Sequence, residues 1–509
     1  MGEWRAWLGG GWHWVKTTWT GVLSCLSGAH GHAWVSFDPV PTLNRIHVAG
    51  LLGRFEHEVE FPEDDSFVIL HGPNGVGKTH LLMLIQSVLS GEFWNLYSIR
   101  FDTFSLNFSE NYSLNVKRTV GTKKQIRVRR QAQVNRRVKQ TVDRPTLELT
   151  LRHGREVLSV WNSDSEDQET GLNPAVRSLL EVDLGFDRFG PDEWYDTRTE
   201  TIMSTDEAIS RFAAMRPERY RESFSAIYRL PTPISEFLAK LPAKFVQTQR
   251  LLVANDYRVS TGARRGSLKS RQSTVVEFSQ DISRIISGKL AENSRISSQL
   301  DRSFPKRVLE RADDPSIKTE DLLQKYQEQS ALRNKLAEVS LLDHATDIPL
   351  QDRELNTTEQ RVLATYLEDA EKKLGTFKDT LDKITLLRDI INERFLYKTL
   401  RIDSSEGFVF ETEGAEERET VSPDQLSSGE QHELVLLYEL LFRTAPGAVV
   451  LIDEPEISLH VKWQREFIND LISVSNLSNL RFIIATHSPQ IVGNWHSKSI
   501  FLAPGEDWQ

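Results

Sequence analysis

The spacing of apolar and polar residues changes along the chain, and each spacing predicts a different kind of element. Residues 45–48 and 58–61 alternate as short strands do, with a turn at Gly53 between them. Residues 67–70 are apolar without interruption, which is typical of a strand buried on both faces, and a helical pattern follows over 78–89. This part of the chain therefore predicts strand, loop and helix in succession.

Alternation returns between about residues 101 and 151 and predicts further antiparallel strands, after which the chain is mainly helical to about residue 401. In 358–395, apolar residues recur at alternating steps of four and three, as in a coiled-coil seam. A second stripe over 319–340 predicts a helix that could pack against the first as an antiparallel hairpin. Two interpretations stay open for this pair: amphipathic helices on a globular core, or a projecting coiled-coil arm.

Strand and helix alternate again towards the end, where 448–452 and 482–485 have the composition of buried parallel strands. The chain is therefore predicted to have an α/β fold, with a mixed sheet, an antiparallel β part and an inserted helical or short coiled-coil region. The predicted domains are a poorly ordered extension (1–34), the first part of the α/β head (35–170), a mainly helical insertion with a short hairpin (171–397) and the second part of the head (398–509).

Composition narrows the class of protein. The chain has 509 residues, 39% of them apolar and 26% charged, which is enough to bury a large core. Its net charge of −10 means that any nucleic-acid contact must come from a local basic patch. Cys25 is the only cysteine, which excludes an internal disulfide and fits a reducing cytosol. No apolar run reaches the roughly 20 residues that a membrane helix needs, so a cytoplasmic protein without membrane contact is predicted.

The first 34 residues have an unusual composition, because tryptophans and glycines gather there without a helical or strand period. A signal peptide is one interpretation, since 29–33 resembles a small-residue cleavage site. Lys16 and scattered polar residues interrupt the apolar region, so a poorly ordered or spurious upstream extension is the preferred interpretation.

A P-loop is the clearest chemical motif. It follows an apolar strand and precedes a helix, as phosphate binding requires. Backbone N–H groups of such a loop surround phosphate oxygens, Lys78 would neutralise charge on the β- and γ-phosphates, and Thr79 would bind Mg²⁺. The predicted nucleotide-binding residues are Gly72, Pro73, Asn74, Gly75, Val76, Gly77, Lys78 and Thr79.

A second motif is the apolar strand at 449–452, which ends in two acids, Asp453 and Glu454. Buried strands seldom end in paired acids without a functional reason. Asp453 would hold Mg²⁺, directly or through water, and Glu454 would act as the general base on the attacking water.

Two further motifs flank this strand in the sequence. Ser427, Ser428, Gly429 and Glu430 precede a helical apolar stretch, where a helix N-terminus would bind an anion, although an ordinary N-cap would look the same. His487 follows the strand at 482–485, at the end of the strand where open α/β sheets bind ligands.

In this order, the four motifs resemble the Walker A, signature, Walker B with D-loop, and switch-histidine motifs of ABC ATPases. The sequence of residues 453–460 is similar to that found in the branch that contains SMC and recombination-repair ATPases, OLD-family proteins and Septu-type anti-phage ATPases. The resemblance implies that two heads sandwich two ATP molecules, with the signature of one head facing the P-loop of the other. It further implies that His487 senses the γ-phosphate and that Arg54 lies near the nucleotide, whereas the Q-loop glutamine cannot be assigned.

The resemblance also implies a biological setting. It predicts an ATP-hydrolysing homodimer or higher homo-oligomer that controls a separate effector, often a nuclease, in anti-phage defence or DNA surveillance. A DNA repair or recombination ATPase remains an alternative. The long separation between the P-loop and the signature disfavours the nucleotide-binding subunit of a transporter, and the short segment after His487 predicts that the chain has no nuclease domain of its own.

A basic stretch supports a nucleic-acid role. Lysines and arginines crowd residues 117–144, and some of them alternate with apolar residues as on one face of a strand. Such a face can bind DNA or RNA phosphates in a salt-dependent way, although a solvated sheet face or a disordered loop would have the same composition. The candidate contacts are Arg127, Arg129, Arg130, Arg136 and Arg137.

Overall fold

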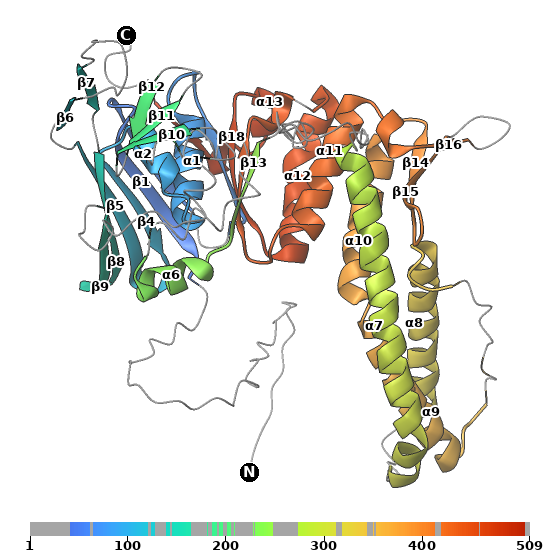
Figure 1. Ribbon diagram of the computed structural model, residues 1–509. Coiled ribbons are helices and arrows are strands. Elements are labelled where there is room, and N and C mark those ends of the chain that lie inside the picture. The colour runs from blue at the N-terminus through green and yellow to red at the C-terminus, as the bar shows by residue number, and fades with distance from the viewer. Residues whose placement is uncertain are drawn as a thin grey trace, which may run out of the picture. The chain divides into compact units, whose positions relative to one another are not determined.

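The computed structural model, drawn in Figure 1, places its elements on two main sheets and a group of long helices. The N-terminal extension predicted for 1–34 lies outside the described residues. Those are 41–61, 65–120, 124–127, 139–142, 145–163, 186–190, 193–196, 201–204, 230–247, 273–311, 318–343, 353–412, 419–457 and 459–503, with residues 181, 208, 228 and 350.

The first sheet has six strands, and every neighbouring pair in it is antiparallel. Its strands alternate between exposed and buried positions, and Ile46 and Val48 are fully buried. This alternation is expected when one face covers a core and the other meets water. In spatial order the strands are β2 (Phe55–Glu60), β1 (Leu43–Leu51), β4 (Thr103–Phe108), β5 (Tyr112–Val120), β8 (Pro145–His153) and β9 (Glu156–Asn162).

The second sheet has five strands, all parallel. Its central strands are apolar except at their ends, as is typical of strands that are buried on both faces. The register sets Asp453 level with Ala485 and Thr486 level with His71, so the carboxyl ends of these strands form one edge. In spatial order the strands are β13 (Ala243–Gln247), β17 (Val449–Asp453), β18 (Arg481–Thr486), β3 (Phe67–His71) and β19 (Ser499–Phe501). The predicted α/β fold class is confirmed.

Strand β13 lies within 171–397, the range predicted to be mainly helical, and pairs with β17 inside the parallel sheet. The same range contains helix α6 (Thr232–Ala239) and a small antiparallel sheet of β10 (Phe186–Gly190), β11 (Glu193–Asp196) and β12 (Thr201–Ser204). Lys244 interrupts the apolar residues of β13, so this strand lacks the continuous apolar run that reveals β3 and β17. Its pairing with β17, about two hundred residues away, is not visible in local sequence.

Helices cover the parallel sheet and complete its core. Helix α1 (Lys78–Leu89) contacts β13, β17 and β18. Buried apolar side chains of β3, β17 and β18 belong to one cluster with those of α11 (Ser428–Phe442) and α12 (Val461–Ser478). Short elements complete this region: α2 (Trp94–Ser98), α13 (Pro489–Val492), and the antiparallel strands β14 (Lys398–Asp403), β15 (Gly407–Thr412) and β16 (Thr420–Val421).

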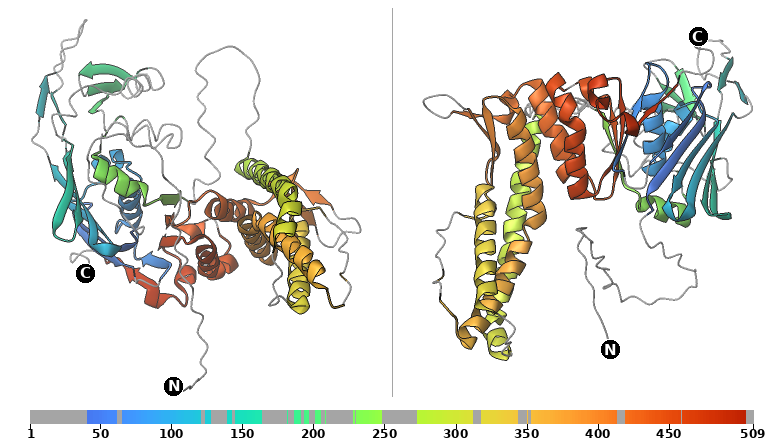
Figure 2. Two further views of the ribbon diagram at one scale, coloured as in Figure 1. Left: turned by 90° about the horizontal axis from the view of Figure 1, so that it is seen from below. Right: turned by 180° about the vertical axis from the view of Figure 1, so that it is seen from behind.

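The inserted helices are α7 (Thr274–Glu310), α8 (Thr319–Glu338), α9 (Thr357–Gly375) and α10 (Lys378–Arg394). The single helix expected over 358–395 is broken between α9 and α10, where Phe377 is the N-cap of α10. Figures 1 and 2 show α7, α8 and α9 side by side, and α10 contacts α11, α12 and β14. Helix α10 thus packs on the globular core, whereas α7, α8 and α9 pack on one another. Each of the two interpretations, helices on a core and a coiled-coil arm, therefore holds in part.

The predicted antiparallel hairpin of α8 and α9 is wrong, because these two helices are parallel. Thr319, at the start of α8, bonds to Leu355 and Gln360 at the start of α9, and Gln329 bonds to the carbonyl of Leu367 further along both. The connecting segment, 339–356, is long enough to return the chain to its starting end. The antiparallel partner of α9 is α7, as the ion pair of Arg307 with Asp369 and that of Lys373 with Asp301 show.

Three helices meet at one buried charge cluster. Arg394, the last residue of α10, donates to Glu433 of α11 over 3.2 Å and forms an ion pair with Asp470 of α12. All three side chains are buried or nearly so, and burial raises the pKa of each carboxyl group to about 7. Within the described part of the chain, no helix is long and apolar enough to cross a membrane.

Candidate functional site

The P-loop lies between β3 and α1 and depends on glycine. Gly75 and Gly77 have φ values of 86° and 92°, which side chains other than glycine rarely adopt. A Cβ at Gly77 would also lie only 2.8 Å from a methyl carbon of Leu51. The loop therefore reaches its conformation only with glycine at these positions.

Lys78, the first residue of α1, turns back over the loop. Its Nζ donates to the carbonyl oxygens of Gly72 at 2.9 Å and Pro73 at 3.0 Å, and it lies 3.4 Å from Nδ1 of His487. Burial lowers the pKa of the amine, and the carboxylates of Glu454 and Asp453 oppose that shift. The loop thus holds a buried cation against two carbonyl groups that a phosphate oxygen could replace.

Thr79 and Asp453 meet across the sheet edge. The Thr79 hydroxyl donates to Oδ1 of Asp453 over 3.1 Å. Burial raises the pKa of Asp453 to about 6, the Thr79 hydrogen bond lowers it, and the neighbouring Glu454 and Glu456 raise it further. Paired oxygen ligands beside crowded carboxylates suit a hard divalent cation that keeps several waters, so these residues fit Mg²⁺.

Glu454 follows β17 in a strained backbone conformation. Its φ is 47°, although it is not glycine, and its N–H donates to the carbonyl of Ala485 over 2.8 Å. This turn leaves Oε1 of Glu454 3.7 Å from Nε2 of His487. The carboxylate after β17 and the imidazole after β18 therefore face the same space as the Lys78 amine.

The signature segment opens α11. Ser427 is the N-cap and forms a capping box with Glu430. The Lys398 amine donates to both carboxylate oxygens of Glu430, at 2.8 and 2.9 Å. Ser427 and Ser428 are exposed, and within the described residues the hydrogen bonds of the segment are local or run to Lys398. The structure thus gathers the P-loop, Asp453, Glu454 and His487 at one edge of the sheet, whereas the signature segment bonds its own neighbours and Lys398.

Arg54 lies in the turn between β1 and β2, where its N–H donates to the Leu51 carbonyl over 3.1 Å. The turn lies against the P-loop, because Leu51 approaches Gly77 and the buried His57 ring bonds the Val76 carbonyl at 2.8 Å. The arginine itself is exposed. Its predicted place near the nucleotide is compatible with this position.

Two residues of the edge have no role in the sequence analysis. Gln247 ends β13, and its backbone is level with Asp453. The sequence leaves the Q-loop unassigned, and the only signal for Gln247 is a polar residue after the apolar pair Phe245-Val246. Glu456 was visible only as part of the D-loop wording, yet its carboxylate bonds the segment after β18.

Most of the predicted nucleic-acid residues lie outside the described part of the chain. Arg127 ends β6 (Lys124–Arg127), which pairs antiparallel with β7 (Lys139–Val142). Arg129, Arg130, Arg136 and Arg137 are outside the described residues. Their contact with DNA or RNA stays a prediction.

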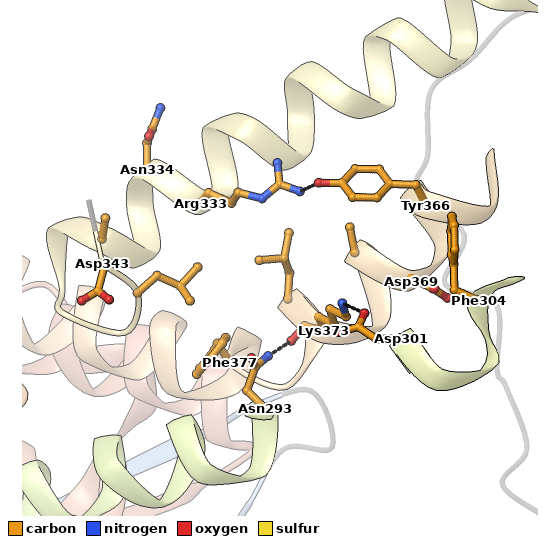
Figure 3. Close-up of a pocket in the computed structure, with 14 residues that line it drawn as sticks. Asn293, Asp301, Phe304, Arg333, Asn334, Asp343, Tyr366, Asp369, Lys373 and Phe377 are labelled. Carbon is orange, nitrogen blue, oxygen red and sulfur yellow. Dashed lines mark hydrogen bonds and ion pairs between the residues drawn. The ribbon is translucent and has the colours of Figure 1, made fainter. Parts of the chain in front are cut away.

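A cavity of about 560 Å³ lies elsewhere, among α7, α8 and α9 (Figure 3). Several polar groups around it bond one another: Arg333 donates to the Tyr366 hydroxyl, and Lys373 pairs with Asp301. None of the predicted nucleotide-binding residues lines it. Its mixed lining of carboxylates, cations and aromatic rings favours no single class of ligand.

Two curated proteins resemble part of the chain. A probable ATPase of retron Ec83 from Escherichia coli is 36% identical over 89 residues, which are 15% of this chain and 16% of that protein. A probable ATPase of retron Vc95 from Vibrio cholerae serotype O1 biovar El Tor is 28% identical over 160 residues, which are 31% of this chain and 28% of that protein. The chain therefore spans less than a third of the length of either relative.

Solved structures show a more distant likeness. An Smc head domain with an extended coiled coil, bound to the C-terminal domain of ScpA and derived from Pyrococcus furiosus, is 14% identical with a TM-score of 0.32. That alignment covers 91% of this chain and 93% of the other. An SmcHead bound to the C-winged helix domain of ScpA is 10% identical with a TM-score of 0.30, covering 89% and 92%.

A protein family described as "AAA domain, putative AbiEii toxin, Type IV TA system" matches residues 223–493. This range is more than half of the chain and runs from before α6 to the end of α13. It includes β13, the signature segment, both acids after β17 and His487. The chain belongs to this AAA domain family.

Proposed function

We propose that the chain binds and hydrolyses ATP with Mg²⁺, and that two copies complete each other's sites. The observation that carries the proposal is the meeting of Lys78, Asp453, Glu454 and His487 at one edge of the parallel sheet. The family match and the relatives named as probable ATPases support this function.

The binding step follows from the geometry of the P-loop. Phosphate oxygens would take the place of the Gly72 and Pro73 carbonyls around the Lys78 amine, while the N-terminus of α1 favours their negative charge. Thr79 and Asp453 would hold Mg²⁺, which supplies positive charge at the phosphates when bound.

Glu454 is the proposed general base. Its carboxylate lies on the His487 side of the site, and its strained backbone fixes where the side chain begins. His487 would hydrogen-bond the terminal phosphate from a position already set beside Lys78. Gln247, level with Asp453, is the residue we propose for the unassigned Q-loop role.

A second copy would supply the signature segment. Ser428 and Gly429 open a helix whose N-terminus suits an anion, and Ser428 is exposed. The Glu430 carboxylate would otherwise repel such an anion, but the Lys398 amine neutralises it. Apolar Ile457 and Val461, 56% and 54% exposed beside the site, are suited to burial against a partner.

The biological role is proposed on a different basis. Control of a separate effector, a nuclease in our proposal, in anti-phage defence or DNA surveillance rests on the motif resemblance and on the two relatives named for retrons. Contact with DNA or RNA through the basic stretch is proposed from sequence alone.

The direct test is phosphate release from Mg-ATP by the purified chain. Wild type should turn over ATP, and Lys78→Ala should release no phosphate above background. Lys372→Ala removes an exposed lysine of α9 and serves as the matched control, which should equal wild type. A folded wild type that neither binds nor hydrolyses ATP would overturn the proposal.

A further inference from the structure

Glu456, three residues after Asp453, forms a bridge to the segment that carries His487. Its Oε1 accepts the backbone N–H of His487 at 2.6 Å, and its Oε2 accepts the Thr486 hydroxyl at 2.8 Å. The Thr486 oxygen in turn accepts the Ser488 N–H at 2.9 Å. One carboxylate thus fixes Thr486, at the end of β18, and His487 directly, and Ser488 through the Thr486 hydroxyl oxygen.

The reason for a carboxylate at this position lies in the sheet. β18 ends at Thr486, which is level with His71 of β3, so the next N–H lies beyond the ladder. Thr486 is fully buried, and an unsatisfied donor there would be costly. A carboxylate accepts both donors at once and has no proton to place against either.

A second tie joins the same two segments. Gln464 of α12 donates to the carbonyls of Glu456 at 3.2 Å and Leu459 at 3.0 Å, and its Oε1 accepts the Ser488 hydroxyl at 2.7 Å. Gln464 and Ser488 are buried. The segment after β17 and the segment after β18 are therefore held together on two sides of His487.

We propose that Glu456 is a positioning residue that holds His487 over the P-loop amine, so that hydrolysis depends on it although it does not itself touch Lys78. This rests on the proposed ATPase function and adds a residue to it. Gln464 bonds both the segment that contains the exposed Ile457 and the residue after His487. The position of His487 therefore also depends on that segment. Contact of a partner with that segment would consequently reach the backbone of His487 and Ser488 through the side chains of Glu456 and Gln464.

The test compares three substitutions in the full chain. Glu456→Ala removes both acceptors and should lower kcat about 10- to 100-fold, as misplacement of a reacting group does. Thr486→Val removes one arm without changing side-chain size, and Glu456→Gln keeps an acceptor for the His487 N–H, so both should lose less. Fluorescent-ATP affinity should change much less than kcat in all three, since Glu456 acts on Lys78 and Asp453 only through its charge. Glu466→Gln, an exposed acid of α12, is the control and should match wild type.

A double-mutant cycle separates positioning from a general structural effect. If Glu456 acts through His487, then His487→Ala and the double variant with Glu456→Ala should have the same kcat. Losses that multiply would overturn the proposal, and so would an unchanged kcat in Glu456→Ala. Thermal unfolding of each variant identifies a folding defect, and in that case Thr486→Val and Glu456→Gln decide. A wild type without ATPase activity would instead overturn the proposed function itself.

Discussion

The amine of Lys78 lies 3.4 Å from Nδ1 of His487, although 409 positions separate the two residues in the chain. The parallel pairing of β3 with β18 causes this, because it sets the loops that follow both strands at one edge. A cation from the first loop and an imidazole from the second can therefore act on the same phosphate group.

Removing the P-loop cation should strongly weaken nucleotide binding. Lys78→Ala removes the buried positive side chain from the loop, and we expect ATP affinity to fall at least about tenfold, as loss of a charge-assisted hydrogen bond does. Titration with a fluorescent ATP analogue measures this. Equal affinity of Lys78→Ala and Lys372→Ala would mean that the loop is not a phosphate site.

Glu454→Gln should separate hydrolysis from assembly. The amide keeps the size of the side chain but cannot take a proton, so hydrolysis should fall about a hundredfold or more. Asp453, Lys78 and Thr79 remain to hold Mg-ATP, and the variant should accumulate as an ATP-bound dimer or larger assembly. Light scattering with and without Mg-ATP records the mass.

Adding Ser428→Arg to Glu454→Gln tests whether the assembly depends on the signature segment. A bulky side chain at the start of α11 should fill the anion site and prevent the ATP-dependent mass increase of Glu454→Gln, while each chain still binds ATP. If the double variant still assembles, the second copy does not contribute its signature segment.

Acid should protonate Asp453 and so remove the proposed ligand of Mg²⁺ from the site. The pKa of Asp453 is raised to about 6, so this carboxyl group takes up a proton as the pH falls through that range and Mg-dependent ATP binding should weaken. Replacing Glu454 by Gln removes a neighbouring negative charge, which should move the acid limb to lower pH. Titrations of Mg-ATP binding from about pH 5 to pH 8, with wild type and Glu454→Gln, test both statements. If binding weakens over the same acid range in both proteins, the statements are contradicted.

The buried charge cluster should make stability depend on pH. The folded pKa of Glu433 is about 7, above its ordinary value of 4.5, so the folded chain retains a proton that the unfolded chain releases. Stability from this group is therefore full below about pH 4.5 and falls as the pH rises towards 7. One Glu433 oxygen is buried without a hydrogen-bond partner among the described residues, in accord with this proton.

Glu433→Gln should equal wild type in stability at about pH 5 and exceed it at about pH 8, by on the order of 1–3 kcal/mol. Glu393→Gln, an exposed acid of α10, should leave the pH dependence unaltered. Urea unfolding at both pH values provides the comparison. Parallel pH curves for Glu433→Gln and wild type would show that Glu433 is ionised in the fold.

Charge reversal tests the basic stretch. Changing Arg127, Arg129 and Arg130 to Glu should weaken binding to DNA or RNA and flatten its salt dependence, because fewer counterions are released. Fluorescence anisotropy at several salt concentrations gives the slope. A wild type without salt-dependent binding to any nucleic acid would leave these arginines as a solvated surface.

Local sequence predicted the parts of the site that lie on continuous segments. The P-loop and the strand before Asp453 each combine an apolar run with polar residues at fixed offsets, and both elements formed at the predicted places. Gln247 and Glu456 could not be recognised in this way. Their positions depend on the pairing of β13 with β17 and on hydrogen bonds to β18, which no local pattern encodes.

The direction of α8 shows the same limit. Its apolar stripe predicted a partner helix but not the order in which the ends meet, because a parallel and an antiparallel pair bury similar stripes. The long segment between α8 and α9 was the sequence feature that allowed the parallel arrangement.

Arg394 also determines where this protein can bend. A rotation of α10 against α11 or α12 would separate the buried Arg394 guanidinium from Glu433 or Asp470. An uncompensated buried charge is strongly unfavourable. These three helices should therefore move together as one rigid unit. The first turns of α7 belong to the same unit, because Arg443 after α11 forms ion pairs with Glu277 and Asp281 of α7, so bending is left to the parts of α7, α8 and α9 that lie beyond these contacts.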